Sequence, residues 1–280
     1  MNEQELQAAR ILIDLALKED VGDGDITTDN IIPAETRRKA KMVAKADGIV
    51  AGLQVAEMVF KSLDPEMNWN VKTPEGTKVK KGDVMVEFEG TYRALLTGER
   101  TALNFLQRMS GIATMSGKYA EAVKDFKTVI LDTRKTLPGF RMLDKYAVKT
   151  GGASNHRIGL YDMAMIKDNH IEVAGGITNA VNAVRSKIKA GIKIEVETTT
   201  LEQVQEALDA GTDIIMLDNM DNETMRKSVD LIAGRAKVEA SGNMTLERLR
   251  EVAATGVDYI SIGALTHSVS ALDISQRLED

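Results

Sequence analysis

The chain has no cysteine among its 280 residues. This absence excludes disulfide bonds, thiol nucleophiles, cysteine-ligated zinc and iron–sulfur clusters. It also fits a reducing compartment, where disulfides are rare.

The chain also lacks an excess of positive charge and any long apolar run. Its formal net charge is −6, so we do not expect a general binder of nucleic acid or of anionic membranes. The longest uncharged apolar stretches are far shorter than a bilayer span. The N-terminus is rich in acidic residues and lacks the basic-then-apolar pattern of a secretory signal. We therefore expect a cytoplasmic protein that binds neither nucleic acid nor membrane.

The remaining composition is that of an ordinary globular protein. With 43% hydrophobic and 28% charged residues, the chain has material for one large domain or two modest ones. The first third mixes helical and strand-like patterns, which predicts an α+β domain. Helices are expected over 3–20, 55–62 and 92–109, and strands near 40–46, 49–51, 68–72 and 84–88.

Two segments of this first domain have alternative interpretations. The acidic glycine loop 22–25 lacks the spacing of a calcium-binding EF-hand, so we interpret it as a turn. The stretch 71–90 has the glycine spacing of a biotin or lipoyl carrier module. No lysine lies in a matching apolar hairpin, which favours a structural β-segment.

A repeat of strands and helices follows Ser110. Nearly continuous apolar runs, typical of parallel strands buried on both faces, lie at 128–132, 163–167, 193–197, 213–218, 237–240 and 259–262. Gly191, Gly211 and Gly256 are expected to close helices in the left-handed conformation. The pattern predicts an α/β barrel, and six clear strands make it incomplete. An open doubly wound sheet is the alternative.

Cationic side chains follow the first two of these strands. Arg134 and Lys135 follow one strand, Lys167 follows the next, and His156 and Arg157 lie in the loop between them. Guanidinium and ammonium groups form charge-assisted bonds with carboxylates and phosphates, so the cluster favours a polyanionic ligand. A solvated charged surface is the alternative.

The later strands end in carboxylates and then in small residues. Glu197 and Asp218 are suited to sugar hydroxyls or to Mg²⁺. Ser241, Gly242 and Gly263 lie where an α/β barrel commonly binds phosphate through backbone N–H groups. A structural ion pair of Glu197 with Lys167 or Lys193 and an Asx turn at Asp218 are the structural alternatives.

The chain resembles the quinolinate phosphoribosyltransferases, also called carboxylating nicotinate-nucleotide pyrophosphorylases, over nearly its whole length. The matching segments are GDGDIT at 22–27, GERTALNFLQRMSGIAT at 98–114, DTRKTLPGFR at 132–141, KYAVKTGGASNHRIGL at 145–160, MIKDNH at 165–170, EVE at 195–197, LDN at 217–219, EASG at 239–242 and SIGALTHS at 261–268. Asn243 departs from the pattern, because a second glycine is expected there. This puts one backbone contact of the phosphate loop in doubt.

The resemblance implies a reaction and an architecture. Quinolinate and phosphoribosyl pyrophosphate (PRPP) would give nicotinate mononucleotide, diphosphate and carbon dioxide, with Mg²⁺, in NAD biosynthesis. The subunit would be an α/β protein with an N-terminal α/β-sandwich domain over 1–112 and an incomplete TIM-like barrel over 113–266. The tail 267–280 would return to the first domain. The resemblance implies a homodimer and leaves open whether dimers assemble into a hexamer.

The resemblance also implies a role for each site residue. Lys135, Lys167, Glu197 and Asp218 are the expected catalytic residues, with Glu197 and Asp218 holding ribose and metal directly or through water. The expected substrate-binding set adds Arg100 of the partner subunit, Thr133, Arg134, His156, Arg157, Ser241, Gly242, Asn243, Ile262, Gly263, Ala264 and His267. Arg100 has no acidic partner at helical spacing, which is consistent with a role between subunits.

Three other functions remain open at this point. A phosphoribosyltransferase acting on nicotinate would bind one carboxylate and would need fewer cations. A Schiff-base aldolase would use Lys167 as nucleophile and would be trapped by borohydride. A non-catalytic scaffold would leave the ordered polar strand ends unexplained.

Overall fold

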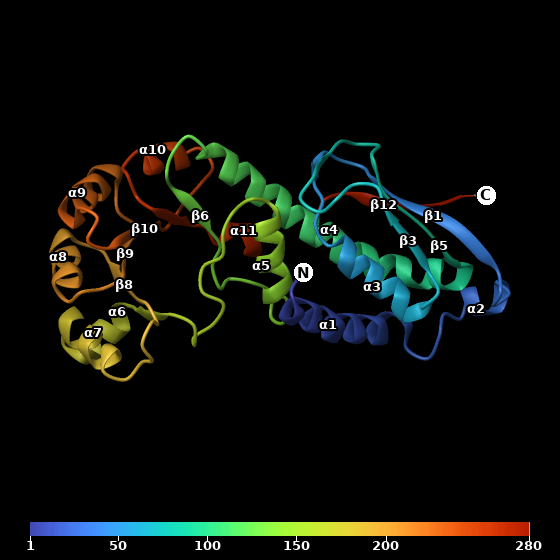
Figure 1. Cartoon of the computed structure of the whole chain (residues 1–280), viewed down its shortest axis with the longest axis horizontal. Coiled ribbons are helices and arrows are strands. Elements are labelled where there is room, and N and C mark those ends of the chain that lie inside the picture. The colour runs from blue at the N-terminus through green and yellow to red at the C-terminus, as the bar shows by residue number, and fades with distance from the viewer. Residues whose placement is uncertain (280) are drawn as a thin grey trace. The chain divides into compact units, whose positions relative to one another are not determined.

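The computed structural model describes residues 1–279, which divide into two compact units (Figure 1). Unit 1 comprises Met1–Gly117, Thr136–Gly152 and the residues from Ala264 onward. Unit 2 comprises Lys118–Lys135 and Ala153–Gly263. This division groups residues 136–152 with the first unit, whereas the sequence assigned them to the barrel. The segment contains a helix whose buried Asp144 accepts two hydrogen bonds from Arg108, and these bonds tie it to unit 1.

Unit 1 is built on an antiparallel sheet with strand order β12-β1-β5-β3. In β5 the alternate side chains Val86 and Phe88 are buried, as expected for one face of a strand packed against the core, and Met85 on the opposite face is buried as well. Pairing of β12 with β1 brings the end of the chain back to this unit. The strands are β1 (Arg37–Ala44), β3 (Asn68–Val71), β5 (Val84–Thr91) and β12 (Ile274–Glu279), and a separate pair is β2 (Gly48–Ile49) with β4 (Lys78–Val79).

The helices of unit 1 include α4, the longest helix in the described part of the chain, whose last residues 118–122 are grouped with unit 2. Helix α1 begins with a capping box, in which Asn2 and Glu5 each bind the other's backbone N–H. Gly111 of α4 lies against the returning tail, where an added Cβ would sit 2.3 Å from the Ser270 carbonyl oxygen. The helices are α1 (Glu3–Val21), α2 (Thr28–Ile31), α3 (Leu53–Leu63), α4 (Tyr92–Ala122), α5 (Arg141–Thr150) and α11 (Ala264–His267).

Unit 2 contains all six predicted strands in one parallel sheet. Their order is β6-β11-β10-β9-β8-β7, so β6 and β7 are its edges and the barrel is incomplete, as predicted. Val196, Ile215 and Ala240 are fully buried in central strands, where both faces of the sheet are covered. The strands are β6 (Val129–Leu131), β7 (Ala164–Ile166), β8 (Ile194–Thr198), β9 (Ile214–Asp218), β10 (Lys237–Ser241) and β11 (Tyr259–Ser261).

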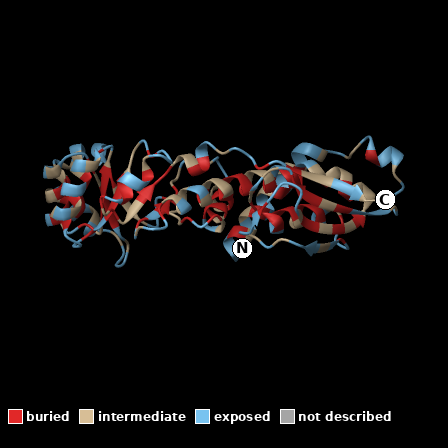
Figure 2. Cartoon of the chain, turned by 90° about the horizontal axis from the view of Figure 1, so that it is seen from above, coloured by how far each residue is buried: buried red, intermediate tan, exposed pale blue. Residues whose placement is uncertain are grey.

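Helices connect these strands and present a solvated outer face (Figure 2). Thr200 and Asp221 cap two of them by accepting backbone N–H groups. Gly211 and Gly256 take positive φ after helices, as predicted. Gly191 also has positive φ, but α7 already ends at Arg185, so the prediction that Gly191 closes a helix was wrong. The helices are α6 (Asp168–Ala174), α7 (Ile177–Arg185), α8 (Leu201–Asp209), α9 (Asn222–Ile232) and α10 (Leu249–Ala253).

Among the described residues, no helix combines the length and apolar character needed to cross a bilayer.

Candidate active site

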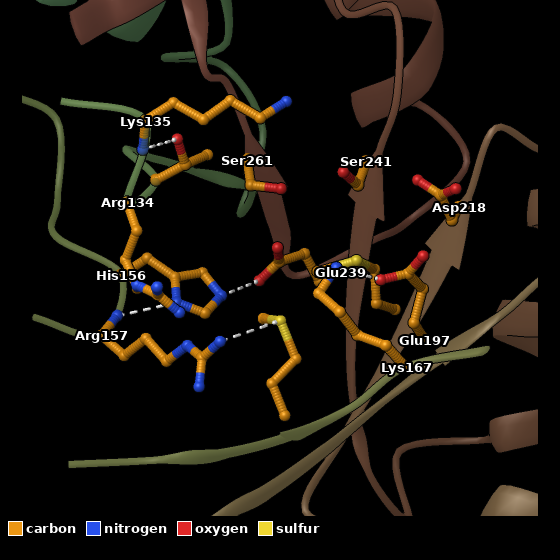
Figure 3. Close-up of a pocket in the computed structure, with 13 residues that line it drawn as sticks. Arg134, Lys135, His156, Arg157, Lys167, Glu197, Asp218, Glu239, Ser241 and Ser261 are labelled. Carbon is orange, nitrogen blue, oxygen red and sulfur yellow. Dashed lines mark hydrogen bonds and ion pairs between the residues drawn. The ribbon is translucent and has the colours of Figure 1, made fainter. Parts of the chain in front are cut away.

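A cavity of about 260 Å³ lies at the carboxyl ends of the unit 2 strands (Figure 3). Parallel strands place their carboxyl ends at one edge of the sheet, which is where barrel enzymes carry their active sites. Nine of the predicted site residues line this cavity. The lining residues are Thr133, Arg134, Lys135, His156, Arg157, Met165, Lys167, Glu197, Met216, Asp218, Glu239, Ser241 and Ser261.

Four cationic side chains lie together in one part of the cavity and come from the segments around β6 and β7, namely Arg134, Lys135, Arg157 and Lys167. Arg134 and Lys135 follow β6, and the backbone N–H of Lys135 donates to Thr133 Oγ1 at 3.1 Å. The Arg157 guanidinium donates to the Met163 carbonyl oxygen at 3.1 Å. Burial, together with the charge of Arg134, lowers the pKa of Arg157 from its ordinary value. Positive charges concentrated in this way favour an anionic ligand.

Two carboxylates belong to the adjacent strands β8 and β9. Glu197 Oε2 accepts a hydrogen bond from the Lys167 ammonium at 2.6 Å. Asp218 ends β9, and its Oδ2 accepts from the Asn219 side-chain amide at 2.8 Å. Carboxylate oxygens at neighbouring strand ends are the donor type that Mg²⁺ prefers, because this ion is held by one or two carboxylates plus substrate phosphates.

A buried cluster lies beneath the cations and was missed by the sequence analysis. His156 Nε2 lies 3.2 Å from Glu195 Oε2 and 3.3 Å from Glu239 Oε2. Both glutamate side chains are fully buried. The backbone N–H of Arg157 donates to His156 Nδ1 at 2.7 Å.

The proton distribution in this cluster follows from these contacts. Burial lowers the pKa of His156, but hydrogen bonds to Glu195 and Glu239 outweigh it and raise that pKa. The raised pKa favours a second ring proton, but on Nδ1 that proton would point at the Arg157 N–H only 2.7 Å away, so the hydrogen-bond geometry favours a ring protonated on Nε2 alone. Burial and the charge of Glu239 raise the pKa of the Glu195 carboxyl to about 7.

The loop after β10 has two residues with left-handed backbone. Gly242 has φ 91°, and a Cβ there would lie 2.2 Å from Asn219 Oδ1. Asn243 has φ 48°, and its side-chain amide donates to the same Asn219 oxygen at 3.1 Å. The departure from glycine at this position is therefore compatible with the left-handed conformation.

Seven predicted site residues do not line the cavity. Four belong to unit 2 and follow β10 or β11, namely Gly242, Asn243, Ile262 and Gly263. Three belong to unit 1, namely Arg100, Ala264 and His267. Arg100 and His267 are exposed, and His267 Nδ1 lies 2.7 Å from Ser268 Oγ.

The residues that the sequence analysis missed share one signal. Each lies two positions before a predicted strand-end residue, so its side chain is on the same face of the strand. The pairs are 165 with 167, 195 with 197, 216 with 218, 239 with 241, and 261 with 263. Because side chains alternate along a strand, the residue two positions before each predicted strand-end residue could have been identified from the sequence as facing the same cavity.

Family models, related proteins and solved structures all match this chain, and together these matches extend over most of its length. The family model described as "Quinolinate phosphoribosyl transferase, C-terminal domain" matches residues 112–277, and the N-terminal domain model of the same name matches 25–110. A carboxylating nicotinate-nucleotide pyrophosphorylase of rice, described as chloroplastic, is 46% identical over 96% of this chain and 77% of its own length. A protein of Bacillus subtilis described as probably the same enzyme is 47% identical over 92% of this chain and 89% of its own. The crystal structure of NadC from Streptococcus pyogenes superposes with a TM-score of 0.95 at 39% identity, covering 100% of both chains.

Proposed function

The chain belongs to the quinolinate phosphoribosyltransferase family, and on this premise we propose a role for each group in the strand-end cavity. The enzyme transfers the phosphoribosyl group of PRPP to quinolinate with decarboxylation, and the products are nicotinate mononucleotide, diphosphate and carbon dioxide. The names of the relatives do not favour the nicotinate alternative. The observation that carries the assignment of roles is the convergence of four cations and the strand-end carboxylates of Glu197 and Asp218 on one cavity.

The cations bind the two carboxylates of quinolinate. Arg134, Arg157 and Lys167 line the cavity with Lys135, and planar guanidinium groups suit bidentate contacts with carboxylate. His156 lies beside them, and Thr133 is at the start of the loop. We also assign a contact with quinolinate to Arg100, which in this proposal comes from the partner subunit of a homodimer.

Glu197 and Asp218 hold the ribose hydroxyls and Mg²⁺, directly or through water. Their position on neighbouring strands and their oxygen ligands fit a cation that arrives with a diphosphate. When bound, Mg²⁺ offsets the negative charge that grows on the leaving diphosphate. The two side chains fix the sugar and keep its anomeric carbon facing the pyridine nitrogen.

The turns after β10 and β11 frame a phosphate group. Ser241 lines the cavity, and small residues around the two turns leave backbone N–H groups accessible. The proposed phosphate-binding residues are Ser241, Gly242, Asn243, Ile262, Gly263, Ala264 and His267.

The chemistry needs positioning and electrostatic stabilisation more than a nucleophilic side chain. As the ribose–diphosphate bond breaks, the anomeric carbon becomes cationic and bonds to the pyridine nitrogen. The ring nitrogen is then positively charged and stabilises the electron pair that stays on C2 when the C2–carboxylate bond breaks and carbon dioxide leaves, before a proton adds to C2. Lys135 and Lys167 lie between the two anionic substrates in this scheme. We also propose that the enzyme is located in the cytoplasm.

The test is diphosphate release from PRPP and Mg²⁺, run in parallel with quinolinate and with nicotinate. Release with quinolinate alone, matched by carbon dioxide, is expected. Release with nicotinate alone would be consistent with the proposed phosphate site but would contradict the proposal that the cations bind two carboxylates. Borohydride trapping of Lys167 with a carbonyl compound would instead support an aldolase.

A further inference from the structure

The imidazole of His156 is held by protein groups at both of its nitrogens. Nε2 faces Glu195 and Glu239 at 3.2 and 3.3 Å, and Nδ1 accepts the Arg157 N–H at 2.7 Å. The His156 side chain is only 6% exposed. Although its ring borders the cavity, neither nitrogen is available as a direct proton donor to a ligand. Figure 3 shows the ring lying between the Arg157 backbone and Glu239.

The same contacts fix the peptide that carries Arg157. Asp132 Oδ1 accepts the backbone N–H of His156 at 2.8 Å, and His156 Nδ1 accepts the next N–H along the chain. Consecutive amides are therefore anchored on both sides of the His156 side chain. The Arg157 guanidinium then extends from a fixed backbone and reaches the Met163 carbonyl oxygen.

A metal centre is the competing explanation, because one histidine and two glutamates offer ligand atoms within 4.8 Å of one another. A histidine that binds metal through one nitrogen normally donates the N–H of its other nitrogen to the protein. Here Nδ1 accepts a hydrogen bond, so the proton is on Nε2, where the metal would have to bind. The geometry therefore supports a hydrogen-bonded cluster.

We propose that Glu195 and Glu239 are positioning residues, which hold the Nε2–H tautomer of His156 so that Nδ1 anchors the Arg157 peptide and aims its guanidinium at a quinolinate carboxylate. This inference rests on the proposed function for the identity of the ligand. Both glutamate side chains are fully buried, although Glu239 is among the residues around the cavity, and in this proposal their effect reaches the reaction through His156 and Arg157.

The kinetic test uses the full-length enzyme and three variants that remove the acceptor oxygens, Glu195→Leu, Glu239→Leu and the double substitution. One remaining carboxylate still accepts the Nε2–H, so each single variant should raise the quinolinate KM by less than about tenfold. The double variant should raise it by about tenfold to a hundredfold, while the PRPP KM changes little. A fall in kcat with an unchanged quinolinate KM would contradict a positioning role.

A control separates this effect from a general loss of stability. Glu75 is another carboxylate held inside the fold, and it accepts backbone N–H groups of Gly52 and Leu53 in unit 1. Glu75→Leu should lower the melting temperature and leave the quinolinate KM unchanged. An equal KM increase in this control would overturn the specific role of the cluster.

A second measurement examines the tautomer without using activity. The chain has only three histidines, so long-range ¹⁵N–¹H correlation of histidine-labelled protein resolves them, and His170→Gln and His267→Gln complete the assignment. His156 is expected to show a protonated Nε2 and an unprotonated Nδ1, and the double leucine variant should lose this fixed state. A doubly protonated ring or an Nδ1–H tautomer in the unmodified enzyme would overturn the proposal. If quinolinate supports no diphosphate release, the proposed function fails, while this spectrum still tests the cluster.

Discussion

The ammonium group of Lys167 lies 2.6 Å from Oε2 of Glu197. Lys167 follows β7 and Glu197 lies on β8, so one ion pair joins the cationic side of the cavity to its carboxylate side. The lysine side chain is 47% exposed and the glutamate 18% exposed, so incoming ligands can reach the lysine. An anionic substrate must therefore compete with Glu197 for this ammonium group.

The shared ion pair makes the effects of substitution at these two positions interdependent. Lys167→Ala and Glu197→Gln should each lower kcat/KM by about tenfold to a hundredfold, as expected for hydrogen bonds to charged groups. The double variant should lose less than the product of the two, with a coupling energy of about 0.5–3 kcal/mol. Steady-state kinetics of the four proteins gives the coupling, and Lys187→Ala on the exposed surface of unit 2 is the control. Strictly multiplicative losses would mean that the pair does not act as a unit.

Strand positions and strand ends could be predicted from the sequence because both depend on local patterns. Buried parallel strands are short apolar runs, and a charged residue after such a run marks where the strand ends. The charged residue after each run did not reveal Glu195 and Glu239, which lie inside the strands two positions before the strand-end residues, and the alternation of side chains gives only the face on which they lie. Their ionisable groups are tolerated there because His156 approaches from a loop about 40 residues before Glu195, a contact between distant residues that no local pattern encodes.

The backbone of Asn243 and the grouping of residues 136–152 illustrate the same limit. Asparagine enters the left-handed region more easily than most residues, but φ 48° at this position depends on the turn around Asn219. Residues 136–152 follow β6 along the chain, which favours assignment to the barrel. Their helix is instead grouped with unit 1, where Arg108 binds Asp144.

The proposed Mg²⁺ site predicts a shift in metal dependence. Chelation by EDTA should abolish diphosphate release, and added Mg²⁺ should restore it, because the leaving diphosphate needs charge neutralisation. Glu197→Gln and Asp218→Asn should each raise the Mg²⁺ concentration at half-maximal rate by about tenfold or more. Asp209→Asn, which changes an exposed carboxylate on α8, should leave that concentration unchanged. Full activity in EDTA would remove Mg²⁺ from the proposed function.

The proposed role of Arg100 in a partner subunit predicts complementation. Arg100→Ala and Lys167→Ala homodimers should each retain about a tenth or less of the unmodified activity. After subunit exchange in equal amounts, half of the dimers are mixed and each has one intact site, which gives about a quarter of the unmodified activity. Exchange is followed by energy transfer between labelled subunits. Complete exchange without recovered activity would show that Arg100 acts within its own subunit.

The loop after β10 predicts different effects for two neighbouring positions. Gly242→Ala adds a methyl group 2.2 Å from Asn219 Oδ1 at φ 91°, so the loop must shift, and the PRPP KM should rise by about tenfold or more. Asn243→Gly should have a much smaller effect, since glycine takes φ 48° without strain.

Gly211 is a control that separates the effect of atomic collision from the effect of backbone strain. Gly211 has φ 72° and no neighbouring atom within 4 Å of an added Cβ, so Gly211→Ala tests strain alone. It should lower the melting temperature and leave the PRPP KM unchanged. If Gly242→Ala behaved in the same way, the loop would not contribute to PRPP binding.

The buried ion pair of unit 1 predicts a large loss of stability when one partner is removed. Arg108 donates to both Asp144 oxygens, at 3.0 and 2.7 Å, and the carboxylate is fully buried. Asp144→Asn leaves the guanidinium without its counter-ion and should cost about 3–5 kcal/mol in the free energy of unfolding. Arg108→Met combined with Asp144→Leu should recover most of this loss, because the desolvation of two charges is avoided. Glu223→Gln, which removes an exposed helical ion pair, should change stability by less than about 0.5 kcal/mol.

The pH dependence of stability gives the same pair a second test. Burial raises the pKa of Asp144 above its ordinary value of 3.8, even though Arg108 lowers it in part. The folded state therefore binds this proton more tightly than the unfolded chain does. The contribution of Asp144 to stability should decrease as pH rises from about 3.8 through the folded-state pKa, and then stay constant. Urea unfolding of the unmodified protein and the Arg108→Met, Asp144→Leu variant across this range isolates the contribution. A difference that grows in favour of the unmodified protein with rising pH would show that the charge of Arg108 outweighs burial.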